Sequence, residues 1–308
     1  MDPTTALRLH EAMLLTRVTE ERLVKLYRQG RTLGSIYRSL GQEGVACGTA
    51  LALGPEDVIG PLIRNLGAML VRGVEPVEVF RQYLGRATGP TGGRELNNHF
   101  GDVARGIIAP TSMLGALVPV MAGVALSFRQ RGEARVAMTW IGDGGSSTGA
   151  FSEGLNFAVV QRLPLIVVGE LNGFAFSTAP ERQMKGHLSA RGQGAFTETV
   201  DGNDPGAVLD AARRARDRCL AGEGPVFLVC ETFRLGGHAE HDDQHYVDPE
   251  LRAVWAAKDP IQRLEAWLET RGQAPPAGLR QRLEAQVEAA AEQALAEPLP
   301  DPEPPSRA

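Results

Sequence analysis

An acidic residue stands inside a glycine-rich turn of the kind that usually binds phosphates. The turn, Gly142-Asp143-Gly144-Gly145, follows an apolar stretch and precedes a stretch with helical periodicity. Backbone N–H groups at such a helix start bind anions, but a carboxylate in the same turn would repel a diphosphate. A divalent cation between the two removes the conflict, because Mg²⁺ takes carboxylate and phosphate oxygens together. Asp143 is therefore a candidate metal ligand, and the amides of Gly144 and Gly145 are candidate anion donors.

A second oxygen ligand follows the next apolar segment of the chain. Asn172 ends the segment 164–172 and is separated from Gly142-Asp143-Gly144 by residues 145–171. The carboxyl ends of neighbouring parallel strands meet at one edge of an α/β sheet, where ligands bind. A dinucleotide fingerprint is excluded, because Ser147 stands at the third glycine position. The spacing predicts a metal–diphosphate site made by Asp143 and Asn172.

The elements that position these residues alternate between strands and helices. This alternation predicts a doubly wound, mainly parallel α/β sheet with helices on both faces. We expect long loops at 86–111 and 180–194, which in a compact domain are usually functional. The expected strands are 56–61, 134–144, 164–172 and 224–234, and the expected helices are 4–29, 41–53, 67–73, 75–85, 115–132, 149–162 and 205–222.

The C-terminal part of the chain has a different pattern. Polar helical periodicity covers 261–272 and 279–296, and the remaining residues are rich in proline. We expect an α/β domain at 1–260, a helical extension at 261–297 and an extended tail at 298–308.

The composition excludes several classes of protein. With 308 residues, 43% of them hydrophobic, the chain can bury a sizeable core, and its net charge of -5 argues against a nucleic-acid partner. No apolar run reaches about 18 residues, so we expect no membrane span. The three cysteines are widely spaced and predict reduced, buried thiols rather than a disulfide framework. The first residues lack a secretory pattern, so a cytoplasmic location is expected.

The chain resembles the alpha subunit of the decarboxylating component of 2-oxo acid dehydrogenases, the pyruvate, branched-chain and acetoin enzymes. The resemblance spans about residues 20–250 and is highly specific, because many short motifs occur in the expected order. These motifs are LYRQGR, GQEGVACGTAL, IRNLGAML, VPVMAGVALSF, GDGGSSTGAFSEGLNFA, LPLIVVGELNGFAFST, VDGND and GHAEHDD. The resemblance implies a thiamine-diphosphate-binding fold and a site that holds thiamine diphosphate with Mg²⁺.

The resemblance also assigns roles to individual residues. It implies that Arg64 contacts the diphosphate, and that the backbones of Ser112 and Leu114 face the aminopyrimidine ring. It implies that His238 is the catalytic residue, in a loop beside the diphosphate where it stabilises the substrate carboxylate or an intermediate. The implied metal–diphosphate site consists of Asp143, Gly144, Gly145, Asn172 and the carbonyl of Phe174.

The implied reaction needs partners. Members of this family work as α2β2 heterotetramers, in which a beta subunit carries the carboxylate that activates the cofactor. The implied activity is oxidative decarboxylation of a 2-oxo acid, with transfer of the acyl group to a lipoyl-bearing acyltransferase.

Some positions depart from the family pattern. Ile63 replaces a tyrosine that would donate a hydrogen bond to a phosphate, and Leu171 replaces an asparagine. Tyr37 stands where pyruvate-type subunits carry a histidine, and Ser112-x-Leu114 resembles the branched-chain enzymes. The resemblance therefore favours a branched-chain substrate.

Two alternatives remain open from the sequence. The loop 238–245 contains His238, His241, Asp242, Asp243 and His245, which is a composition suited to a zinc-dependent hydrolase. A catalytically impaired paralogue that serves as a binding or regulatory subunit would also keep the fold.

Overall fold

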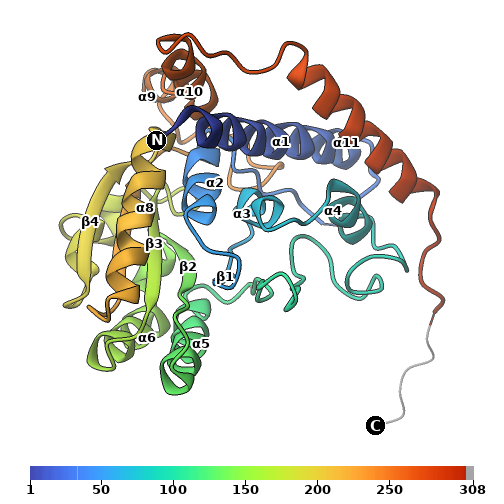
Figure 1. Ribbon diagram of the computed structural model, residues 1–308. Coiled ribbons are helices and arrows are strands. Elements are labelled where there is room, and N and C mark those ends of the chain that lie inside the picture. Colours follow the sequence, from blue (N-terminus) through green and yellow to red (C-terminus); the bar gives the residue numbers. More distant parts are fainter. Residues whose placement is uncertain (33, 303–308) are drawn as a thin grey trace.

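A five-stranded parallel sheet forms the centre of the molecule (Figure 1). The computed structural model describes residues 1–32 and 34–302. The strand order is β1-β2-β3-β5-β4, and every neighbouring pair is parallel. The strands are β1 (Val58–Gly60), β2 (Ala137–Gly142), β3 (Leu165–Leu171), β4 (Phe196–Asp201) and β5 (Val226–Glu231).

Helices cover both faces of this sheet, as expected for a doubly wound α/β fold. Alternate strand residues belong to two separate cores: Trp140 and Val168 pack with α1, α2 and α8, whereas Ile141 and Val167 pack with α5 and α6. Figure 1 shows α5 and α6 together at one end of the sheet and α1 crossing the other end. The helices of these two layers are α1 (Pro3–Arg28), α2 (Glu43–Leu51), α5 (Leu117–Arg131), α6 (Gly149–Val160) and α8 (Pro205–Leu220).

The central strands confirm the sequence prediction. β2 and β3 are buried along nearly their whole length, which is why they appear as continuous apolar runs. β4 was not predicted, because it is an edge strand and its residues are mostly exposed or half-buried. Its polar residues Thr197, Glu198 and Thr199 hide the alternation that a half-buried strand would show.

The connecting segments differ from the expectation in detail. The loop at 86–111 contains isolated β-bridges, one of them between Asp102 and Ile107, but no helix or longer strand. The segment 180–194, predicted to be all loop, contains the short helices α7 (Pro180–Gln183) and η2 (Leu188–Arg191). Helix α9 (Pro249–Ala256) was also missed, because it is short and buries none of its residues. The remaining elements are α3 (Leu66–Val71), α4 (Pro76–Tyr83) and η1 (Gly145–Ser147).

The C-terminal helices pack on the N-terminal helix. α10 (Pro260–Glu269) and α11 (Leu279–Ala296) place Leu264, Leu268 and Leu283 in the same core as α1. The boundary at 260/261 stays a prediction, and residues 303–308 of the expected tail lie outside the described residues. No helix in the described ranges is long and apolar enough to cross a membrane. All three cysteines are buried and free, as predicted.

Candidate functional site

Asp143 and Asn172 lie at the carboxyl ends of two adjacent strands. Asp143 directly follows β2, Asn172 directly follows β3, and Gly142 pairs with Glu170 in the register of the two strands. Both side chains are buried, with 2% and 6% of their surface exposed. The topology therefore brings together the two residues that the sequence selected.

The carboxylate of Asp143 is held in a defined orientation. The side-chain amide of Gln183 donates a 2.8 Å hydrogen bond to Oδ2 of Asp143. Burial raises the pKa of Asp143, and hydrogen bonds from the Gly144 backbone and from Gln183 partly oppose this rise. A buried carboxylate with a raised pKa gains from a bound cation, which would supply the missing positive charge.

The side-chain oxygen of Asn172 has no hydrogen-bond partner among the described residues, although it is buried. The amide nitrogen of Asn172 donates a 3.2 Å hydrogen bond to Oε1 of Gln42. This hydrogen bond fixes the orientation of the amide group and therefore of its free oxygen. An unsatisfied buried oxygen is uncommon and costs free energy unless a ligand completes it. Together with the carboxylate of Asp143, this oxygen fits a hard divalent cation.

Phe174 follows Gly173, whose φ of +92° is accessible mainly to glycine. This turn reverses the chain directly after Asn172. The ring of Phe174 packs edge-on against Phe233 and Tyr246, with centroid distances of 6.1 and 5.3 Å. The role of the Phe174 carbonyl as a ligand stays a prediction.

Arg64 presents a positive charge without a carboxylate partner among the described residues. Its guanidinium donates to the backbone carbonyls of Arg38 and His238, and Nη2 lies 3.1 Å from Nδ1 of His238. Burial and the nearby Arg234 lower the pKa of Arg64 to about 10. A cation that is held by neutral groups and lacks a counter-ion fits an anionic ligand such as a diphosphate.

His238 is enclosed by aromatic rings. Its imidazole lies 5.5 Å from the ring of Tyr37 and 4.6 Å from the ring of Phe176, both edge-on. Burial, followed by the charges of Arg64 and Arg234, lowers the pKa of His238 to about 4. The imidazole is therefore neutral near pH 7.

The loop that carries His238 is tied to the loop after β3 by Arg234. The buried guanidinium of Arg234 donates to the carbonyls of Gly236 and Phe176 at 2.9 and 2.8 Å. Asp242 accepts a 2.6 Å hydrogen bond from the backbone of His238 and another of 2.6 Å from the hydroxyl of Tyr246. Through these contacts Arg234 and Asp242 hold the loop that carries His238 against the segment after β3.

A second group of buried polar residues supports the site, and the sequence analysis did not select it. Glu20 on α1 accepts hydrogen bonds from the backbone N–H and the hydroxyl of Ser39. Glu43 accepts from the guanidinium of Arg17 and, at 3.0 Å, from the N–H of Gly41. These contacts fix the segment 38–43, which supplies the carbonyl to Arg64 and the Gln42 side chain to Asn172. The only sequence feature that could have identified this group is Glu20, a charged residue among the mostly apolar buried positions of α1.

Another buried pair fixes the turn that carries Arg64. The side-chain amide of Asn65 donates to Oε1 of Glu170 at 2.7 Å, and Oδ1 of Asn65 accepts from the N–H of Leu62 at 2.9 Å. Burial raises the pKa of Glu170 to about 7. This pair links the end of β3 to the turn after β1.

Ser112 and Leu114 lie at the exposed edge of the site. The Leu114 side chain is 63% exposed, and a methyl group built on Gly145 would lie 3.8 Å from the Cβ atom of Leu114. Ser112 is exposed, and its hydroxyl lies 3.3 Å from Nε2 of His99. Leu114 is thus beside the glycine turn, while the Ser112 hydroxyl makes no hydrogen bond to another candidate residue within the part of the chain that the structure describes.

The hydrolase alternative gains no support from the 238–245 loop. Across residues 1–32 and 34–302, no three His, Cys, Asp or Glu side chains are arranged to hold a metal ion. His245 instead pairs with Asp243 at the surface, at 2.8 Å.

A parallel sheet with helices on both faces, and with an acid–amide pair at the ends of β2 and β3, is consistent with an α/β fold of the thiamine-diphosphate-binding type. The family described as the dehydrogenase E1 component matches residues 10–304 of the chain. The chain belongs to this family, the E1 alpha subunits of 2-oxo acid dehydrogenases, which are oxidoreductases.

Three relatives show the extent of this similarity. The chain is 36% identical over 265 residues to the pyruvate dehydrogenase E1 alpha subunit of Bacillus subtilis (strain 168), covering 84% of this chain and 69% of that protein. The similarity to the Bacillus cereus protein of the same name is 37% over 265 residues, with the same coverage. The Staphylococcus aureus (strain Mu50) protein of that name is 36% identical over 269 residues, covering 86% of this chain and 70% of the relative.

Proposed function

We propose that the chain is the alpha subunit of a thiamine-diphosphate- and Mg²⁺-dependent 2-oxo acid dehydrogenase, active with a beta subunit in an α2β2 heterotetramer. The observation that carries the proposal is the buried, unpartnered oxygen of Asn172 at the strand end next to Asp143. The reaction is oxidative decarboxylation of a 2-oxo acid, with acyl transfer to the lipoyl group of an acyltransferase.

The chain's own residues would hold the cofactor through its metal and its charge. Asp143, Asn172 and the carbonyl of Phe174 would hold Mg²⁺, which would supply positive charge for the diphosphate. The amides of Gly144 and Gly145 and the guanidinium of Arg64 would bind the diphosphate. When bound, thiamine diphosphate supplies the electron sink for decarboxylation, while the protein supplies orientation and electrostatics.

His238 would act on the substrate through its Nε2 atom. Arg64 has no acceptor, so the contact between its Nη2 and Nδ1 of His238 requires Nδ1 to accept. The proton of the neutral imidazole then resides on Nε2, which can donate a hydrogen bond to the substrate carboxylate. The rings of Tyr37 and Phe176 cover part of the imidazole, and this burial together with the charges of Arg64 and Arg234 keeps it neutral.

The need for a beta subunit is supported by the exposed edge of the site. Met113 and Leu114 are 66% and 63% exposed, although they follow Ser112 next to the proposed aminopyrimidine position. Apolar side chains that remain exposed at a functional edge commonly mark an interaction site. A second chain would cover them and complete the substrate pocket.

For the substrate, we propose a branched-chain 2-oxo acid, with pyruvate as the competing choice. The curated relatives are named as pyruvate enzymes. Tyr37 argues against pyruvate as the substrate. Its aromatic ring lies 5.7 Å from the guanidinium carbon of Arg64 and packs against His238. Tyr37 replaces the histidine of pyruvate-type subunits and makes this wall of the site more apolar.

The test is native mass spectrometry of the chain isolated with its natural partners, followed by a substrate panel. The proposal expects a heterotetramer that carries thiamine diphosphate and Mg²⁺ and that decarboxylates branched-chain 2-oxo acids faster than pyruvate. Faster turnover of pyruvate would overturn the substrate choice alone. A cofactor-bound heterotetramer without turnover would favour the impaired paralogue, and a lone chain without cofactor would refute the proposed function.

A further inference from the structure

A cavity of about 280 Å³ lies on the other side of β3 from the metal site. Asp143 and Asn172 occupy the gap between the ends of β2 and β3, whereas this cavity lies between the ends of β3 and β5. The segment 171–174 separates the metal site from the cavity and supplies residues to both of them. The cavity is therefore distinct from the proposed cofactor site but borders the segment that carries Asn172.

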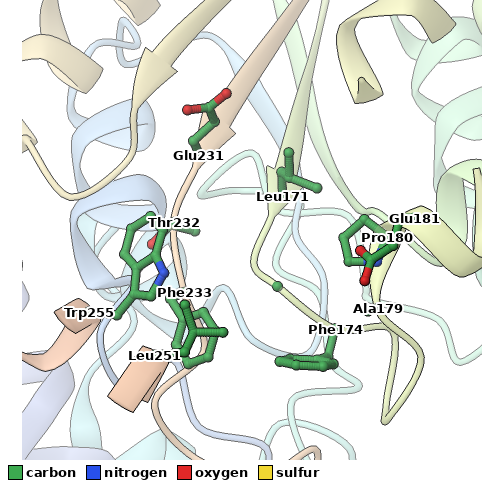
Figure 2. A pocket seen from close by; sticks show the side chains of 11 residues that line it. Leu171, Phe174, Ala179, Pro180, Glu181, Glu231, Thr232, Phe233, Leu251 and Trp255 are labelled. Atoms are coloured by element: carbon green, nitrogen blue, oxygen red, sulfur yellow. The ribbon is translucent and has the colours of Figure 1, made fainter. Parts of the chain in front are cut away.

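The walls of the cavity are aromatic and aliphatic. Figure 2 shows Trp255, Leu251 and Phe233 on one side of the cavity and Phe174 and Pro180 on the other. The rings of Phe233 and Phe174 are in edge contact, with centroids 6.1 Å apart. The rings of Phe233 and Trp255 are stacked, with centroids 5.7 Å apart and an interplanar angle of 12°. These walls come from the end of β5, helix α9, the segment between β3 and α7, and the start of α7. They fit a flat apolar group that is smaller than a drug-sized ligand.

Two carboxylates stand at the edge of these apolar walls. Figure 2 shows Glu231 above the cavity and Glu181 at its far side. Glu231 pairs with His187 at 3.0 Å, whereas Glu181 has no ion pair within the part of the chain that the structure describes. The residues that line the cavity include no lysine or arginine. The charge at this edge is therefore complementary to a cation.

We propose that this cavity is a ligand site for a small aromatic or branched aliphatic ammonium compound. The apolar group packs against the sides of Trp255, Phe233 and Phe174 that line the cavity, and the ammonium group binds Glu181. Apolar walls with a single well-placed charge are typical of small-molecule sites, in which the charge fixes the orientation of the ligand. Neither an anionic nor an uncharged ligand of the same shape uses the carboxylate.

The ligand also regulates the cofactor site, and this part of the inference rests on the proposed function. A methyl group on Gly173 would lie 2.7 Å from the Phe233 ring, so the segment after β3 already packs closely against the cavity wall. A ligand in contact with Leu171 and Phe174 stabilises the present conformation, in which Asn172 is directed at the metal site. Binding of the two ligands is then positively coupled, and by linkage each tightens the other by the same factor.

The experiment uses the assembled alpha–beta enzyme and two probes of similar shape. 2-Phenylethylamine carries the required cation, and 3-phenylpropionate has the same ring with the opposite charge. Isothermal titration calorimetry is expected to give one amine site per alpha subunit, with affinity at least tenfold above that of the acid. Equal affinities, or no amine binding up to about 10 mM, would overturn the site.

Two variants locate the binding. Glu181→Gln is expected to weaken the amine at least fivefold and to leave the acid equally strong or stronger, because the variant no longer repels the anion. Leu251→Trp is expected to fill the cavity and abolish amine binding, and the fold tolerates it because Leu251 lies on the exposed helix α9. Glu250→Gln on the same helix, outside the cavity, is the matched control and should bind the amine as the wild type does. Amine binding that survives Leu251→Trp would place the ligand elsewhere.

The coupling is measured by titrating thiamine diphosphate and Mg²⁺ with and without saturating amine. We expect about fivefold tighter cofactor binding with amine, and the same factor for the amine when the cofactor is present. Unchanged cofactor affinity with demonstrated amine binding would overturn the coupling. If the cofactor fails to bind in every condition while the amine still binds, the proposed function fails and the ligand site stands.

Discussion

Replacing Glu20 by glutamine is expected to change how the stability of the protein depends on pH. Glu20 is 3% exposed, and both of its oxygens accept hydrogen bonds from Ser39. Burial, followed by the charge of Glu43, raises the pKa of Glu20 from 4.5 to about 8. In the native protein at neutral pH, this group is therefore largely protonated, whereas in the unfolded chain it is ionised.

The magnitude follows from proton linkage. Between pH 4.5 and pH 8 the native state binds more protons at Glu20 than the unfolded state, so the free energy of unfolding falls as the pH rises. One pKa unit corresponds to about 1.4 kcal/mol, so the loss across this window reaches about 5 kcal/mol as an upper bound. Glutamine does not titrate and keeps one acceptor oxygen for Ser39. The variant should have stability similar to that of the wild type at pH 5 and should become progressively more stable than the wild type up to pH 8.

The assay is urea denaturation of the wild type and Glu20→Gln at pH 5, 6, 7, 8 and 9. The quantity to follow is the difference between the two free energies of unfolding, because contributions from titrating groups that do not interact with Glu20 cancel. It should rise with pH by as much as about 1.4 kcal/mol per unit and level off above pH 8. A difference that stays constant from pH 5 to pH 9 would show that Glu20 is ionised in the native protein, and the reasoning would be refuted.

Three further outcomes are expected. Glu297→Gln should lower the free energy of unfolding, measured by urea denaturation, by about 1 kcal/mol, because Glu297 accepts two hydrogen bonds from the guanidinium of Arg81. The pKa of Glu297 is lowered to about 2, so this loss of stability should persist at pH 5 and disappear as the pH falls towards 2. Gly173→Ala should lower stability by about 1–3 kcal/mol in the same assay, because a φ of +92° and the close Phe233 ring leave no room for a methyl group; an unchanged midpoint would contradict the described turn. The imidazole of His238 should titrate near pH 4 by NMR. Inorganic diphosphate with Mg²⁺ should raise the pKa of His238 by screening the charges of Arg64 and Arg234. Titration of His238 near pH 6.5 without the anion would contradict the described surroundings.

The strands that position the site could be predicted, because their burial on both faces is a property of consecutive residues. β2 and β3 appear as apolar runs, and the rule that ligands bind at carboxyl strand ends then places Asp143 beside Asn172. β4 could not be recognised, because its exposed edge position permits the polar residues Thr197 and Thr199.

The residues that orient the ligands could not be predicted, because their contacts join segments far apart in the chain. Gln183 donates to Asp143 across 40 residues, and Gln42 accepts from Asn172 across 130 residues. No local periodicity marks such a side-chain pair. Glu20 was detectable only as a charged residue at a buried helical position, and that position becomes known only when α1 is packed.

The central claim is that Asp143 and Asn172 bind the diphosphate of the cofactor through a divalent cation. The most direct measurement is calorimetric titration of thiamine diphosphate into the assembled enzyme, with Mg²⁺ and with EDTA, for the wild type and for Asp143→Asn. We predict that the wild type binds only with Mg²⁺ and that Asp143→Asn weakens binding about 100-fold. Binding by the wild type in EDTA, or unchanged affinity in Asp143→Asn, would contradict the claim.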